Sequence, residues 1–133
     1  MKHGNSLNLA LAFATLWAAL PALAHHAFEA EFDVGQKVKV TGTLVKVDWV
    51  NPHMYFYVEV KDTDGKVVTW SFQNGPPLML RSGGLERDML TIGQQVTVDG
   101  YGAKDGTKHL GWANILHMQD GRVITLNRPK TAP

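Results

Sequence analysis

The stretch Lys37–Trp49, KVKVTGTLVKVDW, decides the fold. Apolar and polar residues alternate along it, as a half-buried strand requires. The alternation changes phase partway, because Val38 and Val40 share one parity and Val47 has the other. We expect the switch around Gly42, a residue type that permits a bulge or a sharp coil. A long first strand bent in this way can serve two sheets.

Further strand patterns follow the break at Asn51-Pro52. Strands are predicted at residues 53–60, 66–74, 92–100, 109–117 and 122–126, and Asp64-Gly65 predicts a hairpin turn between the first two of these. A short helix is predicted within residues 75–84, because prolines precede helix-forming residues there and a pair of glycines follows them. Three meander strands, a helix and two more strands are the order of an OB barrel. We therefore predict a mainly β fold, a small five- to six-stranded OB-like barrel with one short helix between strands 3 and 4. A small antiparallel sandwich with an incidental helix would leave a similar pattern.

The first 24 residues have the three-part layout of a cleavable signal peptide. Lys2 precedes an apolar run from Leu7 to Leu20, and Pro21 ends that run before the small-residue site Ala22-Leu23-Ala24. The run is shorter than the roughly 20 residues that a membrane span needs. We expect a periplasmic or secreted protein without stable membrane insertion.

The mature chain that this cleavage would leave has no charge bias, with 12 Lys and Arg against 12 Asp and Glu. Nucleic-acid binders neutralise phosphates with clustered Lys and Arg, and no such cluster occurs, so we expect no nucleic-acid partner. Cysteine is absent, which excludes disulfides and thiolate ligands. We divide the chain into the signal peptide 1–24, a His-containing segment 25–36, the barrel 37–127 and a polar tail 128–133. These features leave the oligomeric state open.

Several short motifs carry a family resemblance. They are His25-His26-x-Phe28, Trp49-x-Asn51-Pro52-His53, Arg87-Asp-x-Leu90 before Gly93, Ala103-Lys-Asp-Gly106, Ala113-Asn114 and Asp120-Gly121-Arg122. In these residues the chain resembles a family of short exported bacterial proteins known only as a domain of unknown function. The resemblance covers nearly all of the mature chain and implies export and a small barrel, but no activity. Gly84-Leu-Glu-Arg87 departs from the Gly-Trp/Leu-Thr-Arg pattern of that family, a difference we expect to change only a loop.

Two histidines stand directly after the predicted cleavage site. Cleavage after Ala24 gives His25 a free amine beside its own imidazole, and copper(II) favours such nitrogen-rich sites. His26 and His53 are the candidates for a further donor. Because adjacent side chains of an extended segment point opposite ways, His53 is the better partner of His25. We predict a metal site, for copper or another transition metal, drawn from these three histidines.

Simpler roles compete with this metal site. Terminal histidines are often solvated, and His53 can hydrogen-bond the turn after Pro52 instead. Met54 places a thioether next to the imidazole of His53, a combination of ligands that suits copper(I). Met54 has the same strand parity as Phe56, however, which favours packing in the core. Glu31 or Asp33 can serve as a hydrogen-bond partner to a histidine.

Aromatic residues form the alternative binding surface. If Met54 and Phe56 point inward, Tyr55 and Tyr57 point outward on the second strand, a face that OB barrels use for extended ligands. The candidate ligand-binding residues are Trp49, Asn51, Tyr55 and Tyr57, although core packing explains Trp49 as well. The alternative function is a carbohydrate- or protein-interaction domain. No nucleophile motif or phosphate-binding glycine loop occurs, so we expect a non-enzymatic module whose partner is a metal ion, a small ligand or an exported protein.

Overall fold

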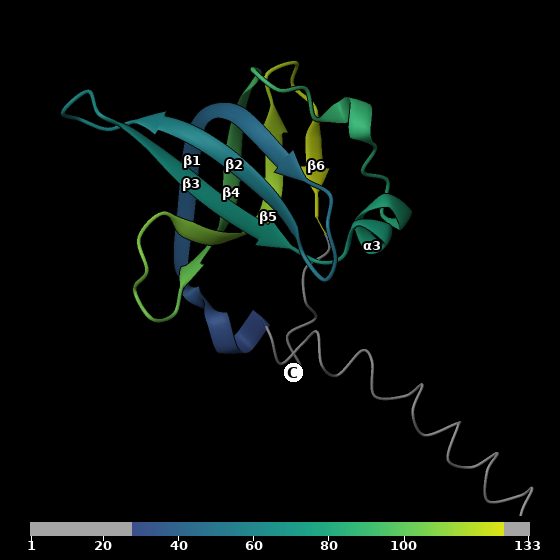
Figure 1. The fold of residues 1–133 in the computed structure, drawn as a ribbon, viewed down its shortest axis with the longest axis horizontal. Helices are drawn as coiled ribbons and strands as arrows, with labels where there is room; N and C mark the ends of the chain where they lie inside the picture. Colours follow the sequence, from purple (N-terminus) through teal and green to yellow (C-terminus); the bar gives the residue numbers. More distant parts are fainter. Residues whose placement is uncertain (1–27, 127–133) are drawn as a thin grey trace, which may run out of the picture. The chain divides into compact units, whose positions relative to one another are not determined.

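Six strands, a helical turn at residues 28–31 and two further short helical segments make up the described fold. The computed structural model describes residues 28–126. The elements are β1 (Phe32–Asp48), β2 (Met54–Lys61), β3 (Val67–Asn74), α3 (Pro77–Ser82), the 3₁₀ turn η1 (Arg87–Met89), β4 (Gln95–Ala103), β5 (Leu110–Met118) and β6 (Val123–Thr125) (Figure 1). Their order is the predicted one.

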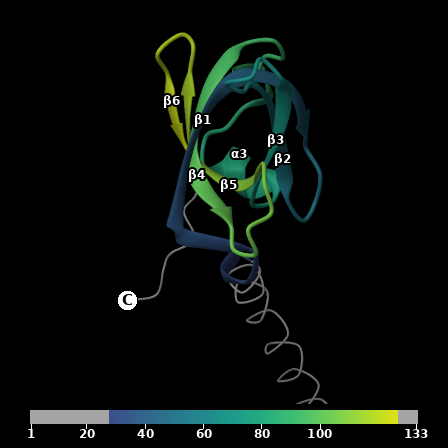
Figure 2. The ribbon, with the colours of Figure 1, turned by 90° about the vertical axis from the view of Figure 1, so that its left-hand side faces the viewer.

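The strands form one sheet that closes on itself. The order is β3-β2-β1-β4-β5-β6, and every neighbouring pair in it is antiparallel. A parallel pairing of β3 with β5, from Ser71 opposite Leu110 to Gln73 opposite Trp112, completes the ring that Figure 2 shows. This ring-like closure distinguishes the fold from an open sandwich. The predicted OB-like barrel is therefore confirmed.

β1 bends so that it pairs on both sides, with β2 through its second half and with β4 through its first. Its register against β2 shifts between Leu44 and Lys46, so the phase change lies there and not at Gly42, where we expected it. Gly42 has a different role, because a Cβ on it would lie 2.1 Å from the carbonyl oxygen of Glu59. The glycine marks a close backbone approach, and the bulge sits beyond it. β1 also begins at Phe32, earlier than the predicted start at residue 37.

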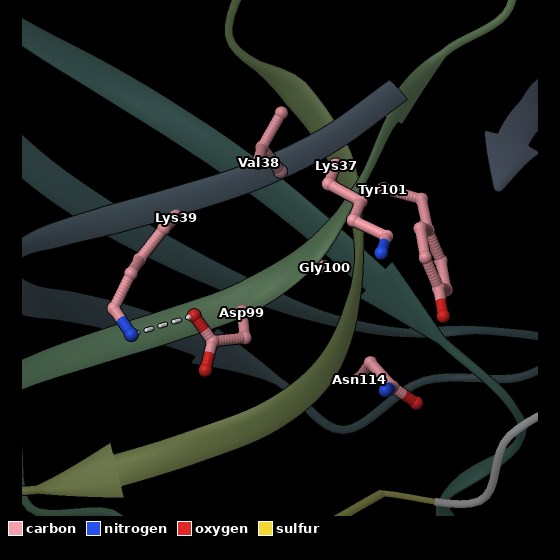
Figure 3. A pocket seen from close by; sticks show the side chains of 7 residues that line it. All are labelled: Lys37, Val38, Lys39, Asp99, Gly100, Tyr101 and Asn114. Atoms are coloured by element: carbon pink, nitrogen blue, oxygen red, sulfur yellow. Dashed lines mark ion pairs between the residues drawn. The ribbon is translucent and has the colours of Figure 1, made fainter. Parts of the chain in front are cut away.

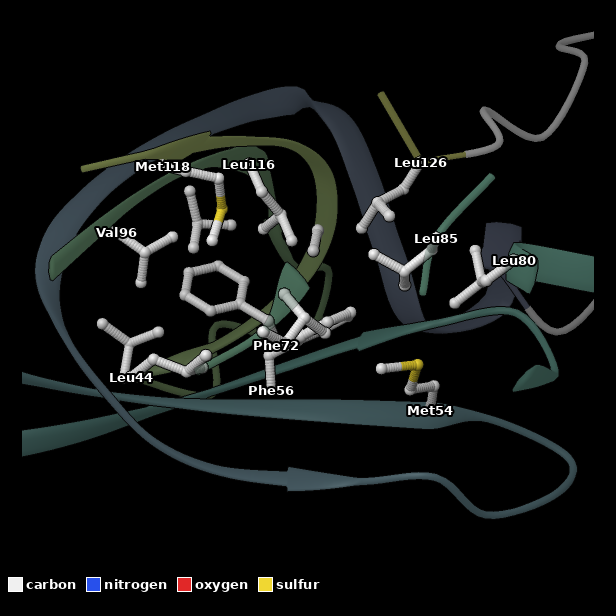
Figure 4. Packing of buried hydrophobic residues seen from close by; sticks show 14 of the residues in the cluster. Leu44, Met54, Phe56, Phe72, Leu80, Leu85, Val96, Leu116, Met118 and Leu126 are labelled. Carbon is white, nitrogen blue, oxygen red and sulfur yellow. The ribbon is translucent and has the colours of Figure 1, made fainter. Parts of the chain in front are cut away.

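The barrel interior is filled by side chains from β1 to β5. Phe56 and Phe72 are almost completely buried, and burial of each such ring contributes about 1.5–3 kcal/mol. Met54 and Met118 belong to the same core, as the parity of Met54 predicts. Figure 4 labels ten of these side chains, with Leu80, Leu85 and Leu126 gathered at one end.

The helix α3 occupies the middle of the predicted 75–84 segment. Pro77 stands in its first turn, where the missing N–H costs nothing, and Gly83 caps its end. Leu80 is its buried residue, whereas Leu78 is 76% exposed. The helix therefore covers the barrel with one narrow face. Within residues 28–126, no helix is long and apolar enough to cross a membrane.

Candidate functional site

Five of the seven predicted site residues lie within the described part of the chain. His25 and His26 fall outside it. His53, Tyr55, Tyr57 and Trp49 are partly exposed, and Asn51 is exposed. They come from the end of β1, the following loop and the start of β2, so chain continuity brings them to one region of the barrel.

His53 lies at the mouth of the barrel, directly before β2. Its ring meets the indole of Trp112 edge-on, with 6.4 Å between centroids, and the ring of Phe32 meets the same indole at 5.8 Å. Trp112 and Phe32 are buried, whereas His53 is partly exposed. We call Phe32, His53 and Trp112 the Trp112 cluster. It joins the start of β1 to the start of β2 and to β5.

A polar contact lies beside the Trp112 cluster. Gln73, opposite Trp112 in the parallel pairing, donates a hydrogen bond from Nε2 to Oε2 of Glu31 at 2.5 Å. We expected Glu31 or Asp33 to support a histidine. Among the described residues Glu31 has an amide partner, and Asp33 accepts a hydrogen bond from the N–H of Gly35 at 2.8 Å.

The outer face of β2 carries the aromatic pair. Met54, Phe56 and Val58 are buried, so Tyr55 and Tyr57 point outward as their parity predicts. Their rings stack with centroids 6.4 Å apart and planes 27° apart.

Two charged side chains from β1 border this pair. The ammonium of Lys46 lies 5.0 Å from the centre of the Tyr57 ring and pairs with Asp48 at 2.8 Å. Partial burial, together with the charge of Asp48, raises the pKa of Tyr57 above its ordinary 10.0, and the charge of Lys46 opposes this shift. Lys46 has a raised pKa because it donates a hydrogen bond to Asp48, with desolvation acting against it. We call Lys46, Asp48, Tyr55 and Tyr57 the tyrosine face.

Trp49 and Asn51 have surroundings of their own, different from those of the tyrosine face. Trp49 packs partly against the core, and the guanidinium of Arg87 lies 4.7 Å from the centre of its ring. Arg87 therefore covers part of the indole, a cation–π contact that ties η1 to the end of β1. Asn51 precedes a cis peptide bond to Pro52 in the exposed loop.

Sequence reasoning missed a polar group on β4 and β5. His117 Nε2 lies 2.6 Å from Oδ2 of Asp99, and Lys39 Nζ lies 3.3 Å from Oδ1 of the same residue. Burial acts to raise the pKa of Asp99, but the hydrogen bonds from His117 and Lys39 outweigh it and hold the pKa below its ordinary value. Asp99 and His117 are both partly exposed, on the outer face of their strands. Their meeting depends on strand register, which the sequence did not reveal.

The described histidines and carboxylates do not gather into a metal centre by themselves. Within residues 28–126, no group of three or more His, Asp or Glu side chains lies close enough together to hold a metal ion. Met54 and Met118 are buried in the core.

The fold and these surfaces define a small OB-like barrel with a partly exposed histidine at its mouth and two stacked tyrosines on its side. The chain belongs to the family of unknown function DUF6152, whose sequence model matches residues 14–112. This confirms the resemblance to a domain of unknown function. Neither a curated protein nor a solved structure shows significant similarity to the chain.

Proposed function

We propose that this protein is an exported, non-enzymatic binding module that holds a transition-metal ion, copper foremost, through the mature N-terminus. The donors are the amine and imidazole of His25, with His53 as the better third nitrogen and His26 as the other candidate. Copper(II) prefers such nitrogen donors, and an amine next to its own imidazole forms a chelate without help from the fold. On this proposal the protein acts in the periplasm or outside the cell.

The observation that carries the proposal is the position of His53. Its imidazole is partly exposed and is held against Trp112, which also contacts Phe32 at the start of β1. Phe32 is the point at which the chain bearing His25 enters the barrel. A histidine fixed at the mouth by an aromatic neighbour loses little side-chain entropy on binding a metal, which favours ligation.

Chain length is compatible with this arrangement. Residues 26–31 separate His25 from Phe32; because residues 28–31 are helical, the segment spans about 15 Å when the rest of it is extended. This reach exceeds the two ring distances that connect Phe32 to His53 through Trp112. His25 and His53 can therefore share one ion without any change in the barrel.

The test is a calorimetric titration of the chain beginning at His25 with copper(II) and with zinc(II). We expect one equivalent of copper(II) to bind with a submicromolar Kd, and binding to weaken at least tenfold when one extra residue precedes His25, because the amine is displaced. His53→Ala should weaken it as well while the fold survives. His109→Asn is the matched control, because it removes an imidazole that packs on Trp70 and asparagine tolerates the positive φ of this position. Copper affinity that is indifferent to both the extra residue and His53→Ala would refute the proposal.

The tyrosine face supports a second candidate function, a carbohydrate- or protein-interaction domain. Two outward tyrosines stacked at 6.4 Å, with Lys46 and Asp48 beside them, present ring faces and polar groups on the side of the barrel. Sugars bind on such surfaces by stacking and hydrogen bonding. A truncated variant distinguishes the two candidate functions. Removal of residues 25–30 abolishes metal binding under the first and leaves ligand binding intact under the second.

A further inference from the structure

A depression on the outer side of β1, β4 and β5 is separate from both surfaces described above. Its volume is about 260 Å³, and its lining includes Lys37, Lys39, Asp99, Gly100, Tyr101 and Asn114. Figure 3 shows Lys37 beside Tyr101, the ion pair of Lys39 with Asp99, and Asn114 across from them. Lys37 and Tyr101 are cross-strand partners in β1 and β4, so they form one wall together.

The depression arises from an irregularity in the pairing of β4 with β5. Asp99 lies opposite Ile115, but Gly100 lies opposite Ala113, so Asn114 is the extra residue of a β-bulge. A Cβ on Gly100 would lie 2.0 Å from the carbonyl oxygen of Trp112, which restricts this position to glycine. The bulge thus places a carboxamide next to a position that has no side chain. The result is a local hollow with a polar lining.

The side chain of Asn114 has an unsatisfied hydrogen-bond acceptor. Its Oδ1 atom is buried and has no hydrogen-bond partner among the described residues. The backbone of the residue is satisfied, because its carbonyl oxygen accepts a hydrogen bond from the N–H of Leu126 at 2.8 Å. Buried side-chain oxygens without partners are rare in folded proteins. The oxygen has almost no accessible surface, so a donor from a bound molecule reaches it only when the carboxamide rotates about χ2 and turns Oδ1 toward the hollow.

The charges around the hollow favour an anion. Both carboxylate oxygens of Asp99 are engaged, one by Lys39 and one by His117. The ammonium of Lys37 stands on the opposite wall. Two lysines against one engaged carboxylate leave an excess of positive charge over the hollow, so an acidic group is attracted and an ammonium is repelled. The donor that suits Asn114 is therefore an uncharged one, such as a hydroxyl.

We infer that this hollow binds a small hydroxylated carboxylate, whose acid group pairs with Lys37, whose hydroxyl donates to Oδ1 of Asn114 and whose carbon skeleton lies against the ring of Tyr101. The volume is close to the lower limit of ordinary ligand pockets, about 300 Å³, which suits a monosaccharide-sized acid. A ligand of that size in an open hollow binds with a Kd on the order of 1 mM.

The experiment is an NMR titration of the ¹⁵N-labelled chain beginning at His25, in metal-free buffer at pH 7. Three probes separate the contributions: glucuronate has both groups, glucose lacks the acid, and cyclohexanecarboxylate lacks the hydroxyls. We expect glucuronate to shift the amide signals of Gly100 and Asn114, and the other two probes to bind about tenfold more weakly or worse.

Three variants test the named contacts. Lys37→Gln should weaken glucuronate binding about fivefold to tenfold, and Asn114→Leu, which keeps the shape and removes the acceptor, at least about tenfold. Lys61→Gln removes another exposed lysine, at the far end of β2, and should leave the affinity unchanged. Because Lys37 is exposed, its variant reports on binding even if Asn114→Leu disturbs the fold.

Several results would overturn the inference. Glucuronate and glucose binding equally, or glucuronate binding unchanged by both Lys37→Gln and Asn114→Leu, would show that the charges and the carboxamide play no part. No shifts at 50 mM glucuronate, a concentration about fifty times the expected Kd, would leave a water molecule as the partner of Asn114. None of these residues belongs to the proposed copper site, so His25→Ala should leave glucuronate binding intact, and failure of either proposal leaves the other standing.

Discussion

Asn74 offers the sharpest test of how the barrel is held closed. Its side chain is completely buried at the end of β3. Nδ2 donates a hydrogen bond to the carbonyl oxygen of Ala113 in β5 at 2.5 Å, and Oδ1 accepts one from the N–H of Gly75 at 2.6 Å. One carboxamide therefore connects the two strands whose parallel pairing closes the ring and also fixes the turn into α3. We predict that Asn74→Ala destabilises the fold strongly.

The magnitude follows from the two groups left behind. A buried donor or acceptor without a partner costs about 1–3 kcal/mol, and two of them cost about 2–6 kcal/mol. Water entering the vacated space recovers part of this, so we expect the free energy of unfolding to fall by about 2–4 kcal/mol. Domains of this size have about 5–15 kcal/mol in total, so the variant still folds.

Urea unfolding followed by tryptophan fluorescence measures the effect. At an m-value of about 1–3 kcal/mol/M, the midpoint should fall by about 0.7–4 M. Asn51→Ala is the matched control, because Asn51 is exposed and its loss should change the stability by less than about 0.5 kcal/mol.

Asn74→Asp adds a pH dependence to the same test. The carboxylate still accepts from Gly75 but cannot donate to Ala113, and burial of its charge raises its pKa in the folded state. The destabilisation should therefore be largest at neutral pH and shrink as the pH falls through that raised pKa, because the protonated acid is neutral and can donate. This account of closure would be refuted if Asn74→Ala and Asn51→Ala had the same urea midpoint. It would also be refuted if the loss of stability in Asn74→Asp did not depend on pH.

Two further predictions concern β4. Gly100→Ala should cost at least about 2 kcal/mol in urea unfolding, since its Cβ would overlap the backbone of Trp112. Gly35→Ala should be nearly neutral, because its Cβ meets only the partly exposed side chain of Asp33, and equal losses in the two variants would contradict the close approach. Asp99→Asn should lower the stability at pH 7 by less than about 1 kcal/mol, because the ion pairs are partly exposed. The pKa of Asp99 is lowered in the folded state, so this contribution exists above the unfolded-state pKa of about 3.9 and should disappear as the pH falls through the lower folded value. A difference between parent and variant that is as large at pH 2.5 as at pH 7 would contradict this assignment.

Local alternation was sufficient to predict the strands, because each strand buries one face and exposes the other. Tyr55 and Tyr57 were placed on the outside for the same reason, once Met54 and Phe56 were assigned to the core. The predicted position of the β1 bulge, at Gly42, was wrong. A glycine in a strand indicates either a bulge or a close backbone approach, and which of the two occurs depends on the partner strand. Here the partner is Glu59, and the approach explains the glycine.

The candidate sites depend on information that alternation does not contain. Parity tells which face a side chain occupies, but the residue it meets there depends on register, and a bulge changes the register by one residue. Asp99 and His117 meet across β4 and β5, and the bulge at Asn114 lies between Asp99 and Gly100 in that pairing. No local pattern marks Asn114 as the extra residue.

The same distinction explains why His53 was found and the hollow was not. His53 was singled out because its neighbours in sequence, the Asn51-Pro52 break and the start of β2, already place it at a strand end. The hollow draws Lys37, Gly100 and Asn114 from three strands far apart in sequence, and none of them is unusual by itself. Their combination exists only because closure of the sheet sets β1, β4 and β5 in one register. A function located in the hollow would therefore depend on the closure that Asn74 maintains, and Asn74→Ala should weaken glucuronate binding even though Asn74 does not line the site.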